Sequence, residues 1–325
     1  MFEQSKQSSQ LASLVASLPW ATVNLVARQL WPSHRFGAPV ISIGNLVAGG
    51  VGKSELVAKI AKHLSEKKIL VCSRGYRSKW EHQGVCSSSY AEGVSLELPD
   101  ELLVVLKKAV GVHVVAGKDR VKALKRYWNE IEPDVVLLDD GFQHFAIHRD
   151  LDILVHDFSV PFLVYRDFPI LFKKAALRVS FSEVPQEWKH LPWVRARYCL
   201  KGIYRKNELI EKPHQAMALC GIGNPGRFKK FLNENGIEVT KWMTFKDHQT
   251  YEHETVKKIT KQIENSSSGL CLTTLKDYVK LEPVLQAKQP ELLEKICWVD
   301  IDIEFLENEQ IFWKVIDDVV AIRTA

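Results

Sequence analysis

The chain has 325 residues, of which 46% are hydrophobic and 26% are charged, and its formal net charge is +5. This composition excludes a disordered chain, and the length allows two domains. The six cysteines form no CxxC pair and show no metal-ligand spacing, which favours buried free thiols in a reducing compartment over a zinc site or a disulfide framework.

The first predicted element is an amphipathic helical segment over residues 1–35. Apolar residues between Leu11 and Trp31 recur at helical spacing in two runs that Pro19 separates. The segment is too interrupted to span a bilayer, and it lacks the cleavage site that is typical of a secretory signal. Two alternatives stay open: the segment lies in a membrane interface with Trp20 and Trp31 at headgroup depth, or it packs on the core.

Apolar strands then alternate with helices. Strands are predicted at residues 39–43, 68–72, 112–116, 135–138 and 151–156, and helices at residues 54–65 and 119–131. The alternation indicates an α/β domain over residues 36–212, in which helices cover both faces of a mostly parallel sheet.

The pattern is irregular from residue 158 to 210 and then resumes, which predicts a second, smaller α/β domain over residues 213–325. Its strands are predicted at residues 216–220, 270–273 and 296–303, and its helices at residues 225–235, 254–264 and 308–320. Whether the last helix packs on the first domain stays open.

A glycine-rich loop, in "VISIGNLVAGGVGKSELV", joins the first predicted strand to the next helix. It matches the phosphate-cradle motif G-x-x-x-x-G-K-[ST], except that Val47 stands where the motif has its first glycine. Backbone N–H groups of such a loop point at phosphate oxygens, Lys53 would reach the β- and γ-phosphates, and Ser54 would bind Mg²⁺. The alternative is a glycine turn without a ligand. The predicted ATP cradle consists of Val47, Ala48, Gly49, Gly50, Val51, Gly52, Lys53 and Ser54.

Two acidic residues, Asp139 and Asp140, end an apolar run in "PDVVLLDDGFQH". Parallel α/β sheets bind their ligands at the carboxyl ends of strands, and a carboxylate placed there can hold Mg²⁺. The two residues could also be simple turn formers. Together with the glycine loop, the pattern favours a Mg²⁺ site made of Ser54, Asp139 and Asp140.

Other polar residues follow predicted strands. Each alone is better explained by a solvated loop or a helix cap, but arginines at several loops suit a phosphate-rich ligand. The candidate substrate or phosphate contacts are Arg74, Glu101, Arg120, Gln143, His144 and Arg149. The N-K-x-D element expected for guanine is not matched, because Lys276 directly precedes Asp277, and ATP is therefore favoured over GTP.

Nine segments in chain order together resemble the tetraacyldisaccharide 4'-kinase (lipid A 4'-kinase) family. They are ISIGNLVAGGVGKSELV, SRGYRS, PDELL, GKDR, PDVVLLDDGFQH, RDLDI, GIGNPGRF, FKDHQTY and TTLKDYVKL, and they cover most of residues 39–281. The chain departs most from the family in residues 157–180, which cannot be matched residue by residue. The family has there a glycine- and proline-rich stretch that ends in an Arg-Glu pair.

The resemblance implies a P-loop NTPase-like fold that uses ATP and Mg²⁺ to phosphorylate the 4'-hydroxyl of a tetraacyldisaccharide 1-phosphate lipid. It implies that Asp100 is the general base and that His248 assists it. It also implies a glycolipid substrate and a membrane contact through residues 1–35, on the cytoplasmic face of the inner membrane of a Gram-negative bacterium. We expect no nucleic-acid partner and infer no obligate protein partner.

Two alternatives to this function stay open. One is a P-loop ATPase switch or metallochaperone, a class that usually adds Cys/His metal-binding pairs, which this sequence lacks. The other is a member of the resembled family with an altered acceptor or lost catalysis. A phosphoryl-transfer assay distinguishes these functions, since ATP turnover without an acceptor would indicate the ATPase switch.

Overall fold

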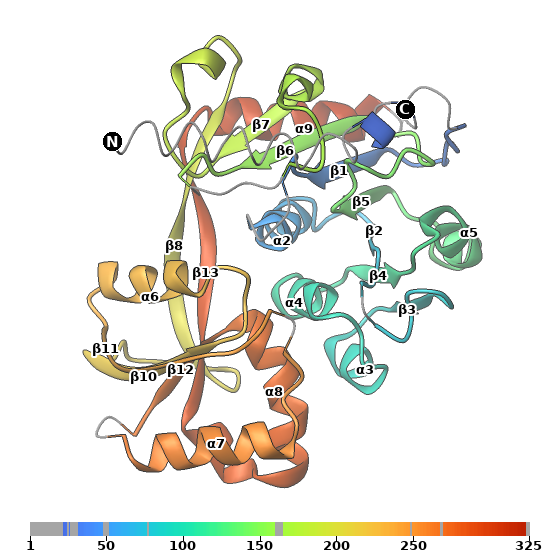
Figure 1. Cartoon of the computed structure of the whole chain (residues 1–325). Coiled ribbons are helices and arrows are strands. Elements are labelled where there is room, and N and C mark those ends of the chain that lie inside the picture. The colour runs from blue at the N-terminus through green and yellow to red at the C-terminus, as the bar shows by residue number, and fades with distance from the viewer. Residues whose placement is uncertain are drawn as a thin grey trace. The chain divides into compact units, whose positions relative to one another are not determined.

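The computed structural model (Figure 1) describes residues 22–24, 26, 32–47, 52–76, 78–159, 165–247, 249–266 and 269–322. The chain forms two compact units: the first comprises Met1–Tyr198 and Ile303–Ala325, and the second comprises Cys199–Asp302. The second unit thus begins before the boundary predicted at residue 212. The reason is that β8 (Val194–Arg205) is one unbroken strand through the boundary, so no linker marks the change of unit.

The sheet of the first unit has the strand order β8-β7-β6-β1-β5-β2-β4-β3. Its pairs are parallel except β3 with β4, which confirms the predicted mostly parallel sheet. The strands are β1 (Val40–Gly44), β2 (Ile69–Ser73), β3 (Val85–Ser87), β4 (His113–Ala116), β5 (Val135–Asp139), β6 (Leu151–His156) and β7 (Leu177–Ser180). The helices are α2 (Lys53–His63), α3 (Tyr90–Ser95), α4 (Asp100–Lys108), α5 (Arg120–Ile131) and α9 (Glu309–Ile322), with short 3₁₀ turns at η1 (Pro169–Lys174) and η2 (Gln186–Trp188).

Helices cover both faces of this sheet. Figure 1 shows α2 and α4 on one face and α5 on the other. Successive strand residues point to opposite faces, and on the α5 face Val40, Leu70 and Val136 pack with Leu124 of the helix. On this alternation Asp139, at the end of β5, belongs to the face that α2 covers. Both faces are apolar and buried, which explains why the strands read as continuous apolar runs.

The last helix packs on the first unit, which answers the question that the sequence left open. His63 of α2 stacks on Trp313 of α9 with ring centroids 4.1 Å apart, and its Nε2 lies 2.8 Å from Asp317 Oδ1. The chain returns to this unit through β13 (Ile296–Glu307), which crosses the unit boundary as β8 does.

The second unit is a smaller α/β layer of parallel strands in the order β11-β10-β12-β13. The strands are β10 (Gln215–Cys220), β11 (Glu238–Thr244), β12 (Cys271–Thr274) and β13, and β9 (Glu208–Ile210) pairs antiparallel with β8. The helices are α6 (Pro225–Glu234), α7 (His253–Glu264) and α8 (Leu275–Lys288), followed by the 3₁₀ turn η3 (Pro290–Glu294). Figure 1 shows α6 and α7 on opposite faces of this sheet.

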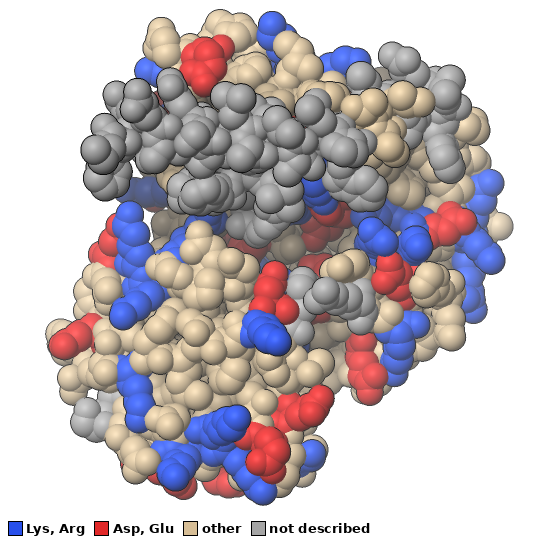
Figure 2. Space-filling view, in the orientation of Figure 1, with Lys and Arg blue, Asp and Glu red and all other residues tan. Residues whose placement is uncertain are grey.

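The outward face of α7 is an ordinary solvated surface. Where α7 lies in Figure 1, Figure 2 shows basic and acidic side chains next to one another. Lys257 Nζ of this helix lies 3.3 Å from Glu254 Oε1.

Only residues 22–24, 26 and 32–35 of the predicted N-terminal segment are described, so the choice between membrane contact and core packing stays a prediction. Among the described residues, no helix has the length and apolar character needed to cross a bilayer. The prediction for the cysteines is confirmed for Cys72, Cys220, Cys271 and Cys297, which are free and buried, while Cys86 and Cys199 are free and half-buried.

His156, the last residue of β6, is expected to make stability depend on pH. Its ring is fully buried against Phe158 and Phe172, and neither ring nitrogen has a hydrogen-bond partner among the described residues. Burial lowers the pKa of His156 from 6.5 to about 4. Below pH 6.5 the unfolded chain therefore binds a proton that the folded chain does not. The free energy of unfolding therefore falls as the pH drops from 6.5 toward 4, and at pH 5 it is about 2 kcal/mol lower than at neutral pH.

Denaturant unfolding at pH 7.5 and pH 5 measures this effect. The His156→Phe variant should lose less stability between the two pH values than the parent does. His82→Gln, a change at an exposed histidine, should behave as the parent. An unchanged pH dependence in His156→Phe would contradict the assignment.

Candidate active site

The glycine loop leads into α2 through a backbone conformation that requires glycine. Gly52 precedes the helix with φ 78°, in the left-handed region. A Cβ at this position would collide with the hydroxyl of Tyr198. Val47 is buried and forms a backbone bridge with Tyr165, while Ala48–Val51 lie outside the described residues. The described part of the cradle is therefore Val47 at its start and Gly52, Lys53 and Ser54 at its end.

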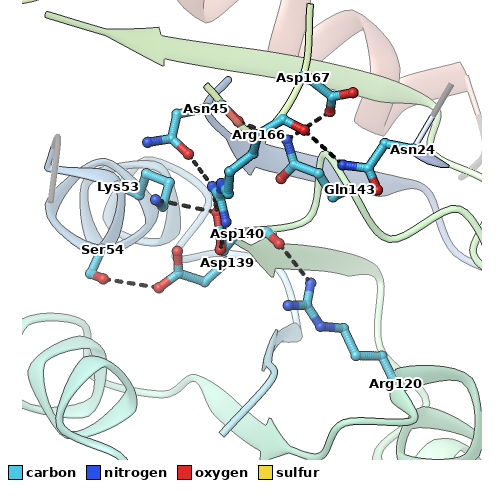
Figure 3. Close-up of polar contacts among 10 residues, drawn as sticks. All are labelled: Asn24, Asn45, Lys53, Ser54, Arg120, Asp139, Asp140, Gln143, Arg166 and Asp167. Carbon is cyan, nitrogen blue, oxygen red and sulfur yellow. Dashed lines mark hydrogen bonds and ion pairs between the residues drawn. The ribbon is translucent and has the colours of Figure 1, made fainter. Parts of the chain in front are cut away.

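Ser54 and Asp139 form the first polar pair of the site. Ser54, in the first turn of α2, donates a hydrogen bond from Oγ to Asp139 Oδ2 at 2.9 Å (Figure 3). Burial raises the pKa of Asp139 and the negative charge of Asp140 adds to this, while Lys53 and Ser54 oppose it. A hydroxyl and a carboxylate thus lie side by side, which is the pairing that the sequence predicted for a Mg²⁺ site.

Asp140 has different surroundings, because two cations hold its carboxylate. Lys53 Nζ lies 3.2 Å from Oδ1, and the Arg166 guanidinium donates to both carboxylate oxygens at 2.7 Å (Figure 3). Burial acts to raise the pKa of Asp140, but Lys53 and Arg166 outweigh it and hold that pKa far below its usual range. The backbone of Asp140 is left-handed at φ 54°, which Asp tolerates better than most residues.

Arg166 is held by contacts with three other segments of the chain. Its guanidinium also donates to Asn45 Oδ1, its N–H donates to the Leu46 carbonyl at 2.7 Å, and its carbonyl accepts from Asn24 Nδ2 at 2.8 Å. The next residue, Asp167, accepts from Gln143 Nε2 at 2.9 Å, and that amide also donates to the Asn45 carbonyl at 2.9 Å. These contacts make site residues of Arg166, Asp167, Asn45 and Asn24, none of which the sequence predicted.

A second pair of acidic residues, Asp100 and Glu101, lies near Asp139. Asp100 and Glu101 begin α4; the Asp100 side chain is buried, and Glu101 Oε1 accepts from Ser73 Oγ at 3.2 Å. Burial raises the pKa of Glu101 well above its usual value, and the charges of Asp100 and Asp139 raise it further. The start of α4 and the end of β5 therefore place their acids close enough to act on one another.

Arg120 contacts the Asp140 backbone, and its charge also acts on His144. Arg120 is buried at the start of α5 and donates from Nη1 to the Asp140 carbonyl at 3.1 Å. Burial lowers the pKa of His144 to about 3, and the positive charges of Arg120 and Arg149 contribute. Arg149 donates to the His144 carbonyl and to Asp152, both at 2.8 Å. These contacts hold His144 neutral at pH 7 and give Arg149 protein partners.

Two further predicted site residues are Arg74 and His248. The Arg74 guanidinium is half-exposed and pairs with Glu81 at 3.0 Å. His248 is not among the described residues.

The chemistry of these groups fits a phosphate ligand with a hard cation. Lys53, Arg166 and Arg120 bring positive charge to the start of α2, where the helix dipole also favours an anion. Among the described residues, no three or more His, Cys, Asp and Glu side chains form a metal-binding group by themselves. Kinase sites hold Mg²⁺ through one or two carboxylates together with phosphate oxygens and water. Ser54 and Asp139 fit that smaller role.

The comparisons with known proteins agree on one family. Residues 9–321 match the sequence profile of the family described as Tetraacyldisaccharide-1-P 4'-kinase. The tetraacyldisaccharide 4'-kinase of Geobacter metallireducens is 34% identical over 269 residues, which cover 76% of this chain and 80% of the relative. The enzyme of that name from Aquifex aeolicus is 34% identical over 259 residues, which cover 75% of this chain and 79% of the relative.

A solved structure supports the same conclusion. The crystal structure of LpxK from Aquifex aeolicus in complex with ATP has a TM-score of 0.74 and 26% sequence identity to this chain, and the match covers 95% of this chain and 98% of that one. It confirms the predicted fold class. The profile match over nearly the whole length, the named relatives and this shared fold show that the chain belongs to the tetraacyldisaccharide 4'-kinase family.

Proposed function

We propose that this protein transfers the γ-phosphoryl group of ATP to the 4'-hydroxyl of a tetraacyldisaccharide 1-phosphate lipid, a step of lipid A biosynthesis. The observation that carries the proposal is the pair of contacts at the start of α2, Lys53 with Asp140 and Ser54 with Asp139. In a chain of this family, they are the groups that a phosphoryl-transfer site needs at the β- and γ-phosphates.

Residues of the first unit have separate proposed roles in binding the phosphates. Lys53 and the backbone N–H groups of the loop would bind the β- and γ-phosphates. Ser54 and Asp139 would hold Mg²⁺, which when bound neutralises charge on the phosphate oxygens. Asp140 keeps Lys53 and Arg166 oriented, and Arg166 can contribute charge toward the transferred group.

Asp100 is the proposed general base and His248 its assisting residue. A sugar hydroxyl is a weak nucleophile, and a carboxylate near it can take its proton as the bond to phosphorus forms. Asp139 and Asp140 have other partners, and the family resemblance assigns the role of base to Asp100.

The acceptor determines where the enzyme works. The acyl chains of a tetraacyldisaccharide stay in the bilayer, so the protein must meet a membrane surface. We propose that residues 1–35 make this contact, on the cytoplasmic face of the inner membrane of a Gram-negative bacterium. Asn24, a described residue of this segment, contacts the backbone of Arg166.

Incubation with γ-labelled ATP, Mg²⁺ and tetraacyldisaccharide 1-phosphate in detergent micelles tests the function. We expect label in the extracted lipid, and none when the acceptor carries a blocked 4'-hydroxyl. ATP hydrolysis at the same rate without any acceptor, and no labelled lipid, would contradict the kinase and favour an ATPase switch.

The variants Asp139→Asn and Asp140→Asn should differ, although the sequence analysis placed both residues at the metal. Asp139→Asn is expected to raise the Mg²⁺ concentration for half-maximal activity at least about tenfold, because an amide is a poorer ligand for a hard cation. Asp140→Asn should lower kcat at saturating Mg²⁺, because Lys53 and Arg166 lose the anion that orients them. Titration of activity with Mg²⁺ measures both, and an equal rise in Mg²⁺ requirement for the two variants would contradict this division.

A further inference from the structure

The second unit has a topological switch point between β10 and β12. The chain leaves β10 through α6 to β11 on one side, and β12 then pairs with the other side of β10. In open parallel sheets, the crevice at the carboxyl ends of two such strands is where ligands bind. Here a side chain of the protein itself bonds both Gly221, after β10, and Thr274, at the end of β12.

Asp277, in the first turn of α8, is that side chain. Its carboxylate is fully buried and accepts hydrogen bonds from Gly221 N–H at 2.9 Å, Thr274 Oγ1 at 2.8 Å and Tyr251 Oη at 2.8 Å. Lys280 Nζ lies 3.4 Å from the same carboxylate. A buried carboxylate needs such partners. The donors come from different places: Gly221 follows β10, Tyr251 follows β11, Thr274 ends β12 and Lys280 lies in α8. One carboxylate thus joins the segments that follow β10, β11 and β12.

Tyr251 is the donor that belongs to the segment after β11. That segment leaves β11 with a hydrogen bond from Phe245 N–H to the Cys220 carbonyl at 2.9 Å, and it turns with one from Gln249 N–H to the Lys246 carbonyl at 3.1 Å. Its far end is fixed where the Tyr251 ring is buried and its hydroxyl reaches Asp277. The segment also packs closely on Gly221, since a Cβ there would lie 3.0 Å from the Lys246 carbonyl oxygen.

The sequence places His248 inside this segment, between the turn at Lys246 and the anchor at Tyr251. We infer that Tyr251 and Asp277 are positioning residues for the phosphoryl transfer, because the hydrogen bond between them anchors the end of the segment in whose sequence His248 lies. The inference rests on the proposed function, in which His248 assists the general base. Binding of ATP at Lys53 does not depend on it.

The variant Tyr251→Phe tests the inference, because it removes the hydroxyl and keeps the buried ring. We expect kcat for lipid phosphorylation to fall about tenfold, since small misplacements of a catalytic group are costly. The KM for ATP should stay near that of the parent, and circular dichroism should show that the variant is folded at the assay temperature, although the buried carboxylate loses one donor. In a His248→Ala background, Tyr251→Phe should cause no further loss, because it acts only through His248. Asp277→Asn is expected to lower kcat in the same way.

Tyr278→Phe is the matched control. Tyr278 is a buried tyrosine of the same unit whose hydroxyl bonds Glu282 within α8, at 3.2 Å, and not the segment after β11. It should leave kcat unchanged.

Three results would overturn the inference. Normal kcat in Tyr251→Phe, with a large loss in His248→Ala, would overturn it and leave the proposed function intact. A further tenfold loss in the His248→Ala background would show that Tyr251 acts independently of His248. No loss in His248→Ala itself would remove the proposed role of that histidine, and the inference with it.

Discussion

The variant Lys53→Ala is expected to lose at least about a hundredfold in kcat for lipid phosphorylation. The transferred phosphoryl group carries its charge on oxygens that this lysine would neutralise in the transition state, and such a charge contributes several kcal/mol. The fold should survive, because the Lys53 side chain is 14% exposed and its ion-pair partner Asp140 keeps a second cation in Arg166. Steady-state kinetics together with thermal unfolding measure the two effects separately.

The matched control for this variant is Lys62→Ala. Lys62 lies on the same helix, α2, but its side chain is exposed in the last turn, so its removal should leave kcat unchanged. Lys53→Arg is a second useful variant, since it keeps the positive charge but changes the shape of the charged group. Turnover close to that of the parent in Lys53→Ala would exclude the P-loop assignment and the kinase mechanism that depends on it.

The core of this site could be predicted from the sequence because its residues belong to local patterns. Lys53 and Ser54 stand at a fixed offset after a strand and a glycine run, and Asp139 ends an apolar run of strand length. Parallel pairing of β1 with β5 then brings the ends of these strands together. The pairing of these two strands therefore brings both local patterns into one site, where Ser54 contacts Asp139.

The contacts of Arg166 could not be predicted in this way. Its partner Asn45 is 121 positions away and its partner Asp140 is 26 positions away, and neither spacing is set by a helix or a strand. Arg166 also lies in the stretch that could not be matched to the family residue by residue. An arginine followed by an acidic residue was a usable signal, because the resemblance implies an Arg-Glu pair in this stretch and this chain has Arg166 followed by Asp167.

The boundary between the two units shows a further limit of the sequence. A change of domain is usually read from a polar or glycine-rich linker. Here the chain passes between units in the middle of β8 and of β13, each of which is a strand of 12 residues. Their apolar and charged residues continue through the boundary, so composition does not mark it.

The variant Asp100→Asn is expected to lower kcat by about a hundredfold and to leave the KM for ATP near its parent value. General base catalysis contributes about a hundredfold to ten-thousandfold, and ATP binding does not need this carboxylate. Asn has the same shape and can still begin α4, so loss of the helix is not expected to explain the result. The neighbouring Glu101 accepts a hydrogen bond from Ser73 Oγ at 3.2 Å, and Glu101→Gln should cost less kcat than Asp100→Asn.

Asp134→Asn is the control for this prediction, because Asp134 lies at the opposite end of β5, where its carboxylate accepts from Lys68 N–H at 2.7 Å. It should leave kcat unchanged. His248→Ala should lower kcat less than Asp100→Asn does, and the double variant should be little worse than Asp100→Asn alone, because two residues that act as a unit lose their effect together. Losses that multiply would show that the two residues act independently. An unchanged kcat in Asp100→Asn would exclude this carboxylate as the base and require another acceptor for the proton of the 4'-hydroxyl.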